Sequence, residues 1–475
     1  MTSDTMTEHP PEVRGSESGP ALPSCRLERL LGRPAAGWTL DDLVALVRER
    51  GIRLLSLLHV GGDGWLKTLD FAPRSVGHVR EIFEGGERAD GSSLFPGLGI
   101  PPDASDVVLR PRITTAFLDP FAPQPTLAVL CSHQGRDGKP LPQSPDTLVR
   151  RAHERLARET GITLHALGEV EYFLGRHPAE GDIYGARDGG YHACAPFVFG
   201  EALRRRALAH LAEIGVGVKY GHAEVGYVEA SEADGVIWEQ HEIELALAPL
   251  PDAADAVMLA QWVLRNLAHA DAVRCSFDPI LRRGHPGNGL HFHFSLVREG
   301  EHLPTRDARG RLTEAAQWLI GGLVCHGGSL MAFGNRVERS FVRLGQAKEA
   351  PSAVKWGEFD RSALVRLPIV ATDASGRPVS PPTIEFRLPD GSAHPHLLLA
   401  GVAQAMVRGR ATPDLPSLID ATDASRLKAE AGAGAPVPRG FDEVAAALRA
   451  QRDVFEAGGV FPAVLLDSVM ARLEA

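Results

Sequence analysis

Residues 168–174 read GEVEYFL, and this short run decides how the larger part of the chain folds. Successive side chains of a β-strand point to opposite faces, so Glu169 and Glu171 share one face while Val170 and Tyr172 pack on the other. A lone pair of this kind is common on the solvent side of an amphipathic strand. The run therefore predicts a strand, and by itself it leaves the role of the two carboxylates open.

The same spacing recurs three times further along the chain. Residues 242–244 read EIE, residues 291–294 read HFHF, and residues 383–387 read TIEFR. Converging carboxylates repel one another unless cations neutralise them, and hard divalent ions with oxygen ligands are the usual solution. The chain has no HExxH helix and no thiolate cluster, which disfavours zinc. Four such strands indicate a site for magnesium or manganese.

A concentration of arginines follows between residues 336 and 366. Arg343, Arg361 and Arg366 stand among glycine, alanine, serine and aromatic residues. Planar guanidinium groups bind carboxylates and phosphates through paired hydrogen bonds, although a solvated helix face is the alternative interpretation. Because the chain lacks a Walker-type phosphate loop, the arginines and carboxylates together favour phosphoryl transfer on another scaffold.

Composition limits the classes of function. The 475 residues are 44% hydrophobic and 23% charged, which predicts a large core and at least two domains. A net charge of -10 argues against nucleic acid as a partner. Five scattered cysteines indicate neither disulfides nor a zinc site. No run reaches the roughly 18 apolar residues of a membrane helix, and the N-terminus has no signal-peptide pattern. We therefore expect no membrane partner and a cytoplasmic location.

Local signals divide the chain into three parts. Residues 1–36 are rich in Pro, Gly, Ser and Glu, which predicts a disordered tail. Residues 37–140 begin with a helix capped by Thr39 and Asp42 and continue as short strands and loops. Residues 141–475 begin with a helix after Ser144-Pro145 and alternate helices with strands. We expect two domains, the second much the larger.

Several segments resemble one family, in the same order along the chain. Residues 287–296 (GNGLHFHFSL) are similar to its NGSGxHxHxSL nucleotide-site signature, and residues 360–366 (DRSALVR) to its NRSAxxRxP stretch. Residues 384–390 (IEFRLPD) are similar to IEFRxPD, and residues 90–93 to DGSS. Arg343-Leu344, followed by Glu349-Ala350-Pro351, resembles its substrate loop. The chain thus resembles the glutamine synthetases.

The resemblance implies an α+β fold: a small N-terminal β-grasp domain followed by a large catalytic α/β domain with a curved antiparallel sheet. It also implies homo-oligomeric rings, commonly dodecamers. The implied activity is an ATP- and magnesium-dependent ligation of glutamate and ammonia through γ-glutamyl phosphate, with two Mg or Mn ions in each active site.

The resemblance also assigns residues. One metal ion would be held by Glu171, Glu224 and Glu242, and the other by Glu169, His291 and Glu385. Arg343, Tyr191 and Gly287 would bind substrates, and His293, Ser295 and Arg366 would line the nucleotide site. Arg361 and Arg387 would stabilise the transferring phosphoryl group, Glu349 would close over the intermediate, and Asp90 would deprotonate ammonium beside Tyr191 and Glu224.

Departures from the family pattern lie near the substrates. Residues 225–241 are about ten residues longer than the pattern, which we expect to form a surface loop at the substrate entrance. Pro286 replaces a glutamate-binding asparagine, and Lys219 replaces a nucleotide-contacting acid. No counterpart of the adenylylated tyrosine segment is found, and residues 379–382 lack the usual basic residue. Two alternatives stay open: a γ-glutamyl ligase for an organic amine such as ethanolamine, a polyamine, methylamine or an aniline, or a non-catalytic relative.

Overall fold

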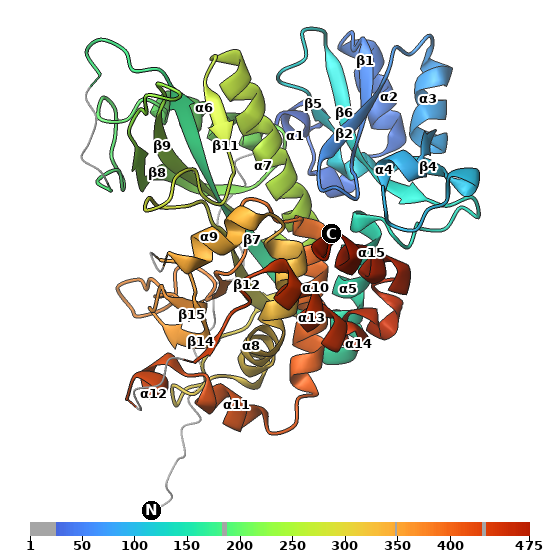
Figure 1. Ribbon diagram of the computed structural model, residues 1–475. Coiled ribbons are helices and arrows are strands. Elements are labelled where there is room, and N and C mark those ends of the chain that lie inside the picture. The colour runs from blue at the N-terminus through green and yellow to red at the C-terminus, as the bar shows by residue number, and fades with distance from the viewer. Residues whose placement is uncertain (1–24, 183–187, 347–348, 430–433) are drawn as a thin grey trace, which may run out of the picture.

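The computed structural model describes residues 25–182, 188–346, 349–429 and 434–475, which form two sheets and the helices around them (Figure 1). The N-terminal sheet has the order β2-β1-β6-β4-β3, with β5 beside β6. Its strand β1 runs parallel to β6 and antiparallel to β2. The strands are β1 Leu54–Val60, β2 Leu66–Phe71, β3 Glu87–Asp90, β4 Asp106–Pro111, β5 Phe117–Leu118 and β6 Thr126–Gln134.

Two helices pack against this sheet, α2 (Leu40–Glu49) and α3 (Val76–Gly85). The predicted start of α2 is confirmed, because Thr39 and Asp42 form a reciprocal capping box. The predicted tail is wrong for its last part. Residues 26–31 form helix α1 (Arg26–Leu31), whose Leu27 is fully buried in the same core. Residues 1–24 of that tail lie outside the described residues.

The larger sheet has the order β17-β14-β15-β16-β12-β7-β9-β8. Neighbouring strands are antiparallel except β14 and β15, which are parallel. Short strands β10, β11 and β13 pair at its margins. The strands are β7 Thr163–Arg176, β8 Val218–Val228, β9 Ile237–Leu245, β10 Ala248–Pro249, β11 Arg274–Ser276, β12 Leu290–Arg298, β13 Glu301–His302, β14 Ala353–Glu358, β15 Ala363–Leu367, β16 Ile384–Phe386 and β17 Ala435–Pro436.

Long helices form the core beside this sheet. Helix α10 packs on α5, α7 and α8, and α7 also lies against β7. As predicted, α5 begins at Pro145 after Ser144 and ends before Gly161, which has a left-handed backbone. The helices are α4 Gly91–Leu94, α5 Pro145–Thr160, α6 Glu201–Glu213, α7 Leu250–Ala270, α8 Glu314–Gly334, α9 Glu338–Gly345, α10 Pro395–Arg410, α11 Leu415–Ala421, α12 Ala424–Ala429, α13 Phe441–Ala450, α14 Arg452–Glu456 and α15 Ala463–Leu473.

The two faces of β7 differ as the alternation predicts. Val170 and Tyr172 are buried in the core with the helices. Glu169 and Glu171 point to the opposite face, where the side chains of neighbouring strands meet them. The large sheet therefore has one apolar face and one face that gathers charge.

Candidate active site

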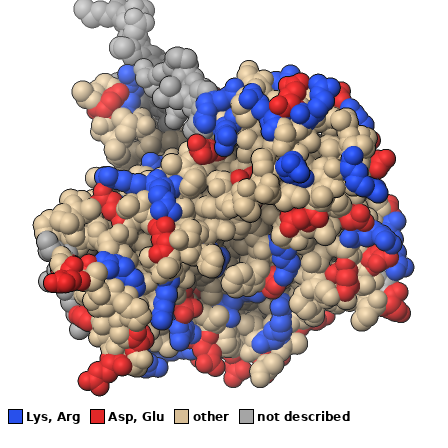
Figure 2. All heavy atoms as spheres, turned by 90° about the horizontal axis from the view of Figure 1, so that it is seen from above, with Lys and Arg blue, Asp and Glu red and all other residues tan. Residues whose placement is uncertain are grey.

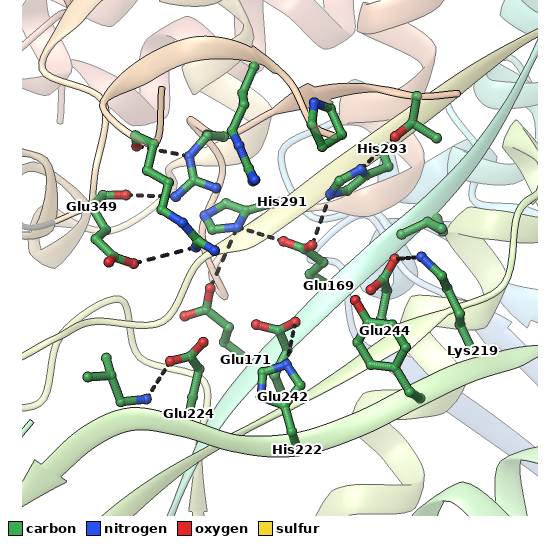
Figure 3. A pocket seen from close by; sticks show the side chains of 18 of the residues that line it. Glu169, Glu171, Lys219, His222, Glu224, Glu242, Glu244, His291, His293 and Glu349 are labelled. Atoms are coloured by element: carbon green, nitrogen blue, oxygen red, sulfur yellow. Dashed lines mark hydrogen bonds and ion pairs between the residues drawn. The ribbon is translucent and has the colours of Figure 1, made fainter. Parts of the chain in front are cut away.

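Strand register brings the four predicted polar pairs together. Glu169 on β7 lies between Glu244 on β9 and His291 on β12, and Glu171 lies beside Glu242. On the other side of β12, His293 faces Glu385 on β16. Segments that are far apart in sequence thus place their charged side chains on one patch of the sheet (Figure 3).

A cavity of about 1030 Å³ opens above this patch. Of the predicted site residues, all but Asp90, Ser295 and Glu385 line it. Glu385 is fully buried just beneath the wall, and Ser295 is fully buried and hydrogen-bonds His302, whose ring does line the cavity. Ser295 therefore contacts the cavity lining only through His302, and its assignment to the nucleotide site stays a prediction.

One group of ligand atoms lies around Glu169. Its carboxylate accepts hydrogen bonds from His291 Nδ1 and from His293 Nε2, both at 2.9 Å. Burial opposes ionisation, but the charge of His293 and the hydrogen bonds of both histidines hold the pKa of Glu169 well below its ordinary value. Potential ligand atoms of Glu169, His293 and Glu385 lie within 4.8 Å of one another, and His291 Nδ1 is 3.8 Å from Glu385 Oε1.

A second group lies around Glu242. Ligand atoms of His222, Glu224 and Glu242 also lie within 4.8 Å of one another. Burial and the charge of Glu171 raise the pKa of Glu224 to about 8, and burial with neighbouring carboxylates raises the pKa of Glu242 well above its ordinary value. Such repulsion is what a bound cation relieves, so this donor set of carboxylates and imidazole fits Mg or Mn.

Gln240, which the sequence assignment did not include, connects the charged patch to the loop before β12. Gln240 Nε2 lies 3.0 Å from Glu171 Oε2, 3.0 Å from the Gly287 carbonyl and 3.1 Å from Asn288 Oδ1. Gly289 N also donates to Glu171 at 2.9 Å. A Cβ at Gly289 would approach His291 Nε2 to 2.4 Å, so the loop needs glycine there.

Arginines gather at one end of the cavity. The buried Arg343 donates to the Leu388 and Pro389 carbonyls at 3.3 Å, and its Nη2 lies 3.2 Å from His291 Nε2. Arg366 donates to Glu385 at 2.7 Å, and Arg387 contacts the other oxygen of the same carboxylate. Buried guanidinium groups beside a carboxylate patch form a fixed positive wall for an anionic substrate.

Arg361 is more exposed than Arg366 and Arg387 of this wall. Arg361 Nη1 lies 3.7 Å from Glu349 Oε2, and both side chains are about half exposed or more. Glu349 has a left-handed backbone (φ 53°), and its carbonyl accepts a hydrogen bond from Arg387 at 2.9 Å. Both residues line the cavity, so this exposed pair lies at its rim.

The opposite end of the cavity contains a lysine and apolar side chains. Lys219 Nζ contacts Glu244 Oε1 at 2.6 Å, and its charge lies over the Tyr220 ring. The apolar residues that line the cavity include Leu167, Val218, Leu247, Ile369 and Val379. Lys219 stands where the family pattern has an acidic residue. Glu244 on β9 therefore places an acidic side chain directly beside that position.

Asp90 lies outside the cavity and in the other sheet. It caps the short helix α4, accepting hydrogen bonds from Ser92 Oγ at 2.7 Å and Ser93 Oγ at 2.6 Å. These hydroxyl donors hold the pKa of Asp90 below its ordinary value, so the carboxylate stays ionised. Within one chain, Asp90 is not brought together with Tyr191 and Glu224, which do line the cavity.

Only the middle of the longer segment 225–241 is a surface loop. It extends β8 and β9 into a hairpin whose turn runs through residues 229–236, with Gly235 in a left-handed conformation. Val228 and Ile237 are buried in this extension. The loop prediction is therefore wrong for the two ends of the segment, because these β-branched residues prefer a pleated strand and find buried partners there.

The period-two pattern also includes two residues that the sequence assignment missed, Gln240 and His222. Gln240 shares a face with Glu242 and Glu244, and His222 shares a face with Glu224, each pair at a spacing of two. Both side chains line the cavity. The same period-two signal that revealed Glu169 and Glu171 would have revealed them.

The comparisons with known proteins agree with one another. The family model for the glutamine synthetase catalytic domain matches residues 142–471. A glutamine synthetase of Azospirillum brasilense is 30% identical over 455 residues, with 89% of this chain and 92% of the relative covered. One from Vibrio cholerae is 28% identical over 470 residues, with 91% and 95% covered.

Solved structures give the same fold. The cryo-EM structure of Plasmodium falciparum glutamine synthetase superposes with a TM-score of 0.76 at 16% identity, with 92% of this chain and 95% of that chain covered. A structure of GmaS with ADP has a TM-score of 0.69 at 19% identity, with 90% and 94% covered. The predicted fold class is confirmed.

Proposed function

The chain belongs to the glutamine synthetase family of carbon–nitrogen ligases, and from this premise we propose that it joins ammonia to the γ-carboxylate of glutamate at the expense of ATP. One observation supports the proposal above the others. Six candidate metal ligands and four arginines converge on one cavity or its immediate wall. A carboxylate is a poor electrophile, and ATP converts it into an acyl phosphate.

In the first step, a γ-carboxylate oxygen of glutamate attacks the γ-phosphorus of ATP, and ADP leaves. Arg343 would bind the α-carboxylate of glutamate, and Arg361 and Arg387 would stabilise the charge on the transferring phosphoryl group. His293 and Arg366 would border the nucleotide phosphates. Glu349 at the rim would close over the acyl phosphate and exclude water.

Two Mg or Mn ions would bind on this patch. As the resemblance implies, Glu171, Glu224 and Glu242 would hold one, and Glu169, His291 and Glu385 the other. The groups of ligand atoms that lie within 4.8 Å of one another overlap these sets but contain His222 in place of Glu171 and His293 in place of His291. When bound, such ions neutralise charge on phosphate oxygens. The chain's own contribution is to hold these carboxylates in place through Gln240, Gly289 and the arginines.

In the second step, the amine nitrogen attacks the acyl carbon and phosphate leaves with one carboxylate oxygen. Ammonium must first lose a proton, which Asp90 would accept beside Tyr191 and Glu224. Since Asp90 lies outside the cavity of its own chain, this role requires a second copy to supply it. We therefore propose a homo-oligomeric ring, of dodecameric size, with sites between subunits.

A second candidate is a γ-glutamyl ligase for an organic amine. Two observations favour it: the β8–β9 hairpin is extended beside Glu224, and Pro286 lines the cavity where the family pattern has a glutamate-binding amide. The nitrogen chemistry is the same for both candidates. Only the space around the nucleophile distinguishes them.

Several wider expectations also stand as proposals. The division at residues 140 and 141 marks two domains, and the enzyme acts in the cytoplasm on small molecules. Within the described part of the chain, no helix has the length and apolar character needed to span a bilayer. The face in Figure 2 intersperses basic and acidic side chains, which suits a protein without a nucleic acid partner.

The proposal is tested by phosphate release from ATP and Mg with glutamate, comparing ammonium with a panel of amines and identifying each product by mass. Glutamine as the main product supports the ammonia ligase. A substituted γ-glutamyl amide as the main product supports the second candidate. Absence of any amide product, with or without ATP cleavage, would overturn the proposed function.

A further inference from the structure

A second cavity, of about 240 Å³, adjoins the active-site cavity. Glu224 and Gln240 line both cavities, so the two spaces meet at these side chains. The rest of the smaller cavity is formed by one segment before α6 and by the extended hairpin. Its other lining residues are Gly189, Gly190, Ala193, Phe197, Val198, Gly226, Tyr227 and Glu239.

The outer wall of this cavity is tethered at several points. His192 N donates to the Ala223 carbonyl of β8 at 2.9 Å. Ala195 N donates to Glu201 Oε2 at 2.6 Å, and Phe199 N donates to Glu239 Oε2 at 2.9 Å. The segment from Gly189 to Gly200 is thus fixed to β8, to α6 and to β9, which makes the cavity a built feature of the fold.

The extended hairpin forms the floor. The pairing of β8 with β9 shifts between Ala223 and Tyr227, and Glu224 to Gly226 lie in that irregularity. Gly226 N donates to Gln240 Oε1 at 3.1 Å, and a Cβ on Gly226 would come within 2.5 Å of the same oxygen. The longer segment thus contributes Gly226, Tyr227, Glu239 and Gln240 to the wall of the space beside Glu224.

The chemistry of the lining selects an apolar occupant. Ala193, Phe197, Val198 and Tyr227 offer methyl groups and aromatic rings. The Glu239 carboxylate is already engaged by the backbone N–H groups of Phe199 and Gly200 and by His241 Nε2 at 2.8 Å. A second ammonium group would find no free carboxylate on this wall, whereas an alkyl or aryl group would be desolvated favourably.

We propose that the smaller cavity holds the apolar substituent of a primary amine whose nitrogen stands at Glu224. This inference rests on the γ-glutamyl ligase chemistry that both proposed functions share, and it favours the second of them, with an alkylamine or arylamine as the nucleophile. At roughly 30 Å³ for each water-sized group, the cavity accommodates about eight non-hydrogen atoms. Ammonia occupies the same nitrogen position and leaves the smaller cavity to water.

The test compares ammonium, methylamine, butylamine and benzylamine as nucleophiles at equal concentrations of unprotonated base, with amide products identified by mass. Wild-type enzyme is expected to use butylamine or benzylamine with a kcat/KM at least equal to that for ammonium. Ala193→Leu, which fills the cavity, is expected to lower the ratio of benzylamine to ammonium kcat/KM at least tenfold. Phe197→Ala, which widens it, is expected to raise that ratio.

A matched control lies on the same segment. Cys194→Leu makes a similar enlargement at an exposed residue outside the cavity lining and should leave the ratio within twofold of wild type. If ammonium yields glutamine but no substituted amine yields product, or if Ala193→Leu and Cys194→Leu give the same ratio, the inference is overturned and the proposed function stands. If neither ammonium nor any amine yields an amide, both are overturned.

Discussion

The two sheets of the molecule use the same alternation of side chains for opposite purposes. In the N-terminal sheet, Leu55 and Leu57 of β1 pack with α2 and α3 in an apolar core. In the large sheet, one face carries the buried carboxylates of Glu171, Glu242 and Glu385. Apolar burial stabilises without a partner, whereas buried carboxylates need cations, hydrogen bonds or protons. The charged face therefore costs stability unless cations, hydrogen bonds or protons neutralise it, whereas the apolar core does not.

Glu385→Ala should have the largest effect on the charged face. We expect at least about a thousandfold loss of ATP turnover, because the variant removes a proposed metal ligand and, with it, several kcal/mol of charge stabilisation. The exposed Glu301 on β13 is the matched control, and Glu301→Ala should retain wild-type turnover. Circular dichroism of both variants should match wild type. Full turnover in Glu385→Ala would disprove the role of the charged face.

Asp90→Ala separates the two chemical steps. We expect acyl-phosphate formation within a few-fold of wild type and amide formation slowed about a hundredfold, since only the second step uses the base. Rapid-quench measurement of ADP and of amide distinguishes the steps. Equal loss in both steps would remove Asp90 from the base role.

The same variant tests whether Asp90 acts on a neighbouring copy. Co-expressed Asp90→Ala and Glu385→Ala subunits should regain part of the activity that each lacks alone. Some sites would then combine the intact Asp90 of a Glu385→Ala subunit with the intact Glu385 of an Asp90→Ala subunit. Each variant expressed alone is the control. Mixed oligomers without regained activity would place the base elsewhere.

The charged face should also respond to pH in a way that the apolar core does not. The pKa of Glu224 is raised from 4.5 to about 8, so the native chain holds a proton that the unfolded chain releases between these values. Without metal, the contribution of Glu224 to the free energy of unfolding should fall as pH rises from about 4.5 to 8. Calorimetry of the metal-free protein checks this direction.

The affinity for a metal ion should rise with pH, whereas the stability of the metal-free protein falls. Binding must displace the Glu224 proton, so Mn affinity should rise by up to about tenfold per pH unit below pH 8. Titration followed by the Mn electron paramagnetic resonance signal measures it, and Glu224→Gln should weaken the affinity and flatten its pH dependence. An affinity independent of pH in wild type would contradict the repulsion described for this face.

The smallest expected effect belongs to the N-terminal sheet. Thr39→Ala removes the capping box of α2 and should cost about 1 kcal/mol, which is about a fivefold increase in hydrogen exchange of the α2 amides. Amides of β7 are the internal control. Altered Mn binding in this variant would show that the two regions are coupled more closely than their separate cores suggest.

Local signals were readable from the sequence because they need only neighbours in the chain. The cap at Thr39, the start of α5 at Pro145 and the faces of β7 all follow from spacing. The roles of Arg343 and His291 came from family resemblance, not from spacing. The structure adds which groups touch: His291 lies against Glu169 and Arg343.

Other features depended on partners that spacing does not encode. Helix α1 forms because Leu27 finds a buried position in the N-terminal core. The 225–241 hairpin forms because Val228 and Ile237 are buried. The separation of Asp90 from Tyr191 is a matter of how two sheets are placed, which no local pattern reports. Gln240 and His222, by contrast, were within reach of the alternation signal.

We expect the charged face to activate the γ-carboxylate of glutamate as an acyl phosphate. The most direct measurement uses glutamate labelled with ¹⁸O in its γ-carboxylate, together with ATP, Mg and ammonium or an amine, and determines the label in released phosphate by mass spectrometry. One ¹⁸O atom in each phosphate, matched by one amide, is the predicted result. Phosphate without label, although ATP is cleaved, would contradict the account.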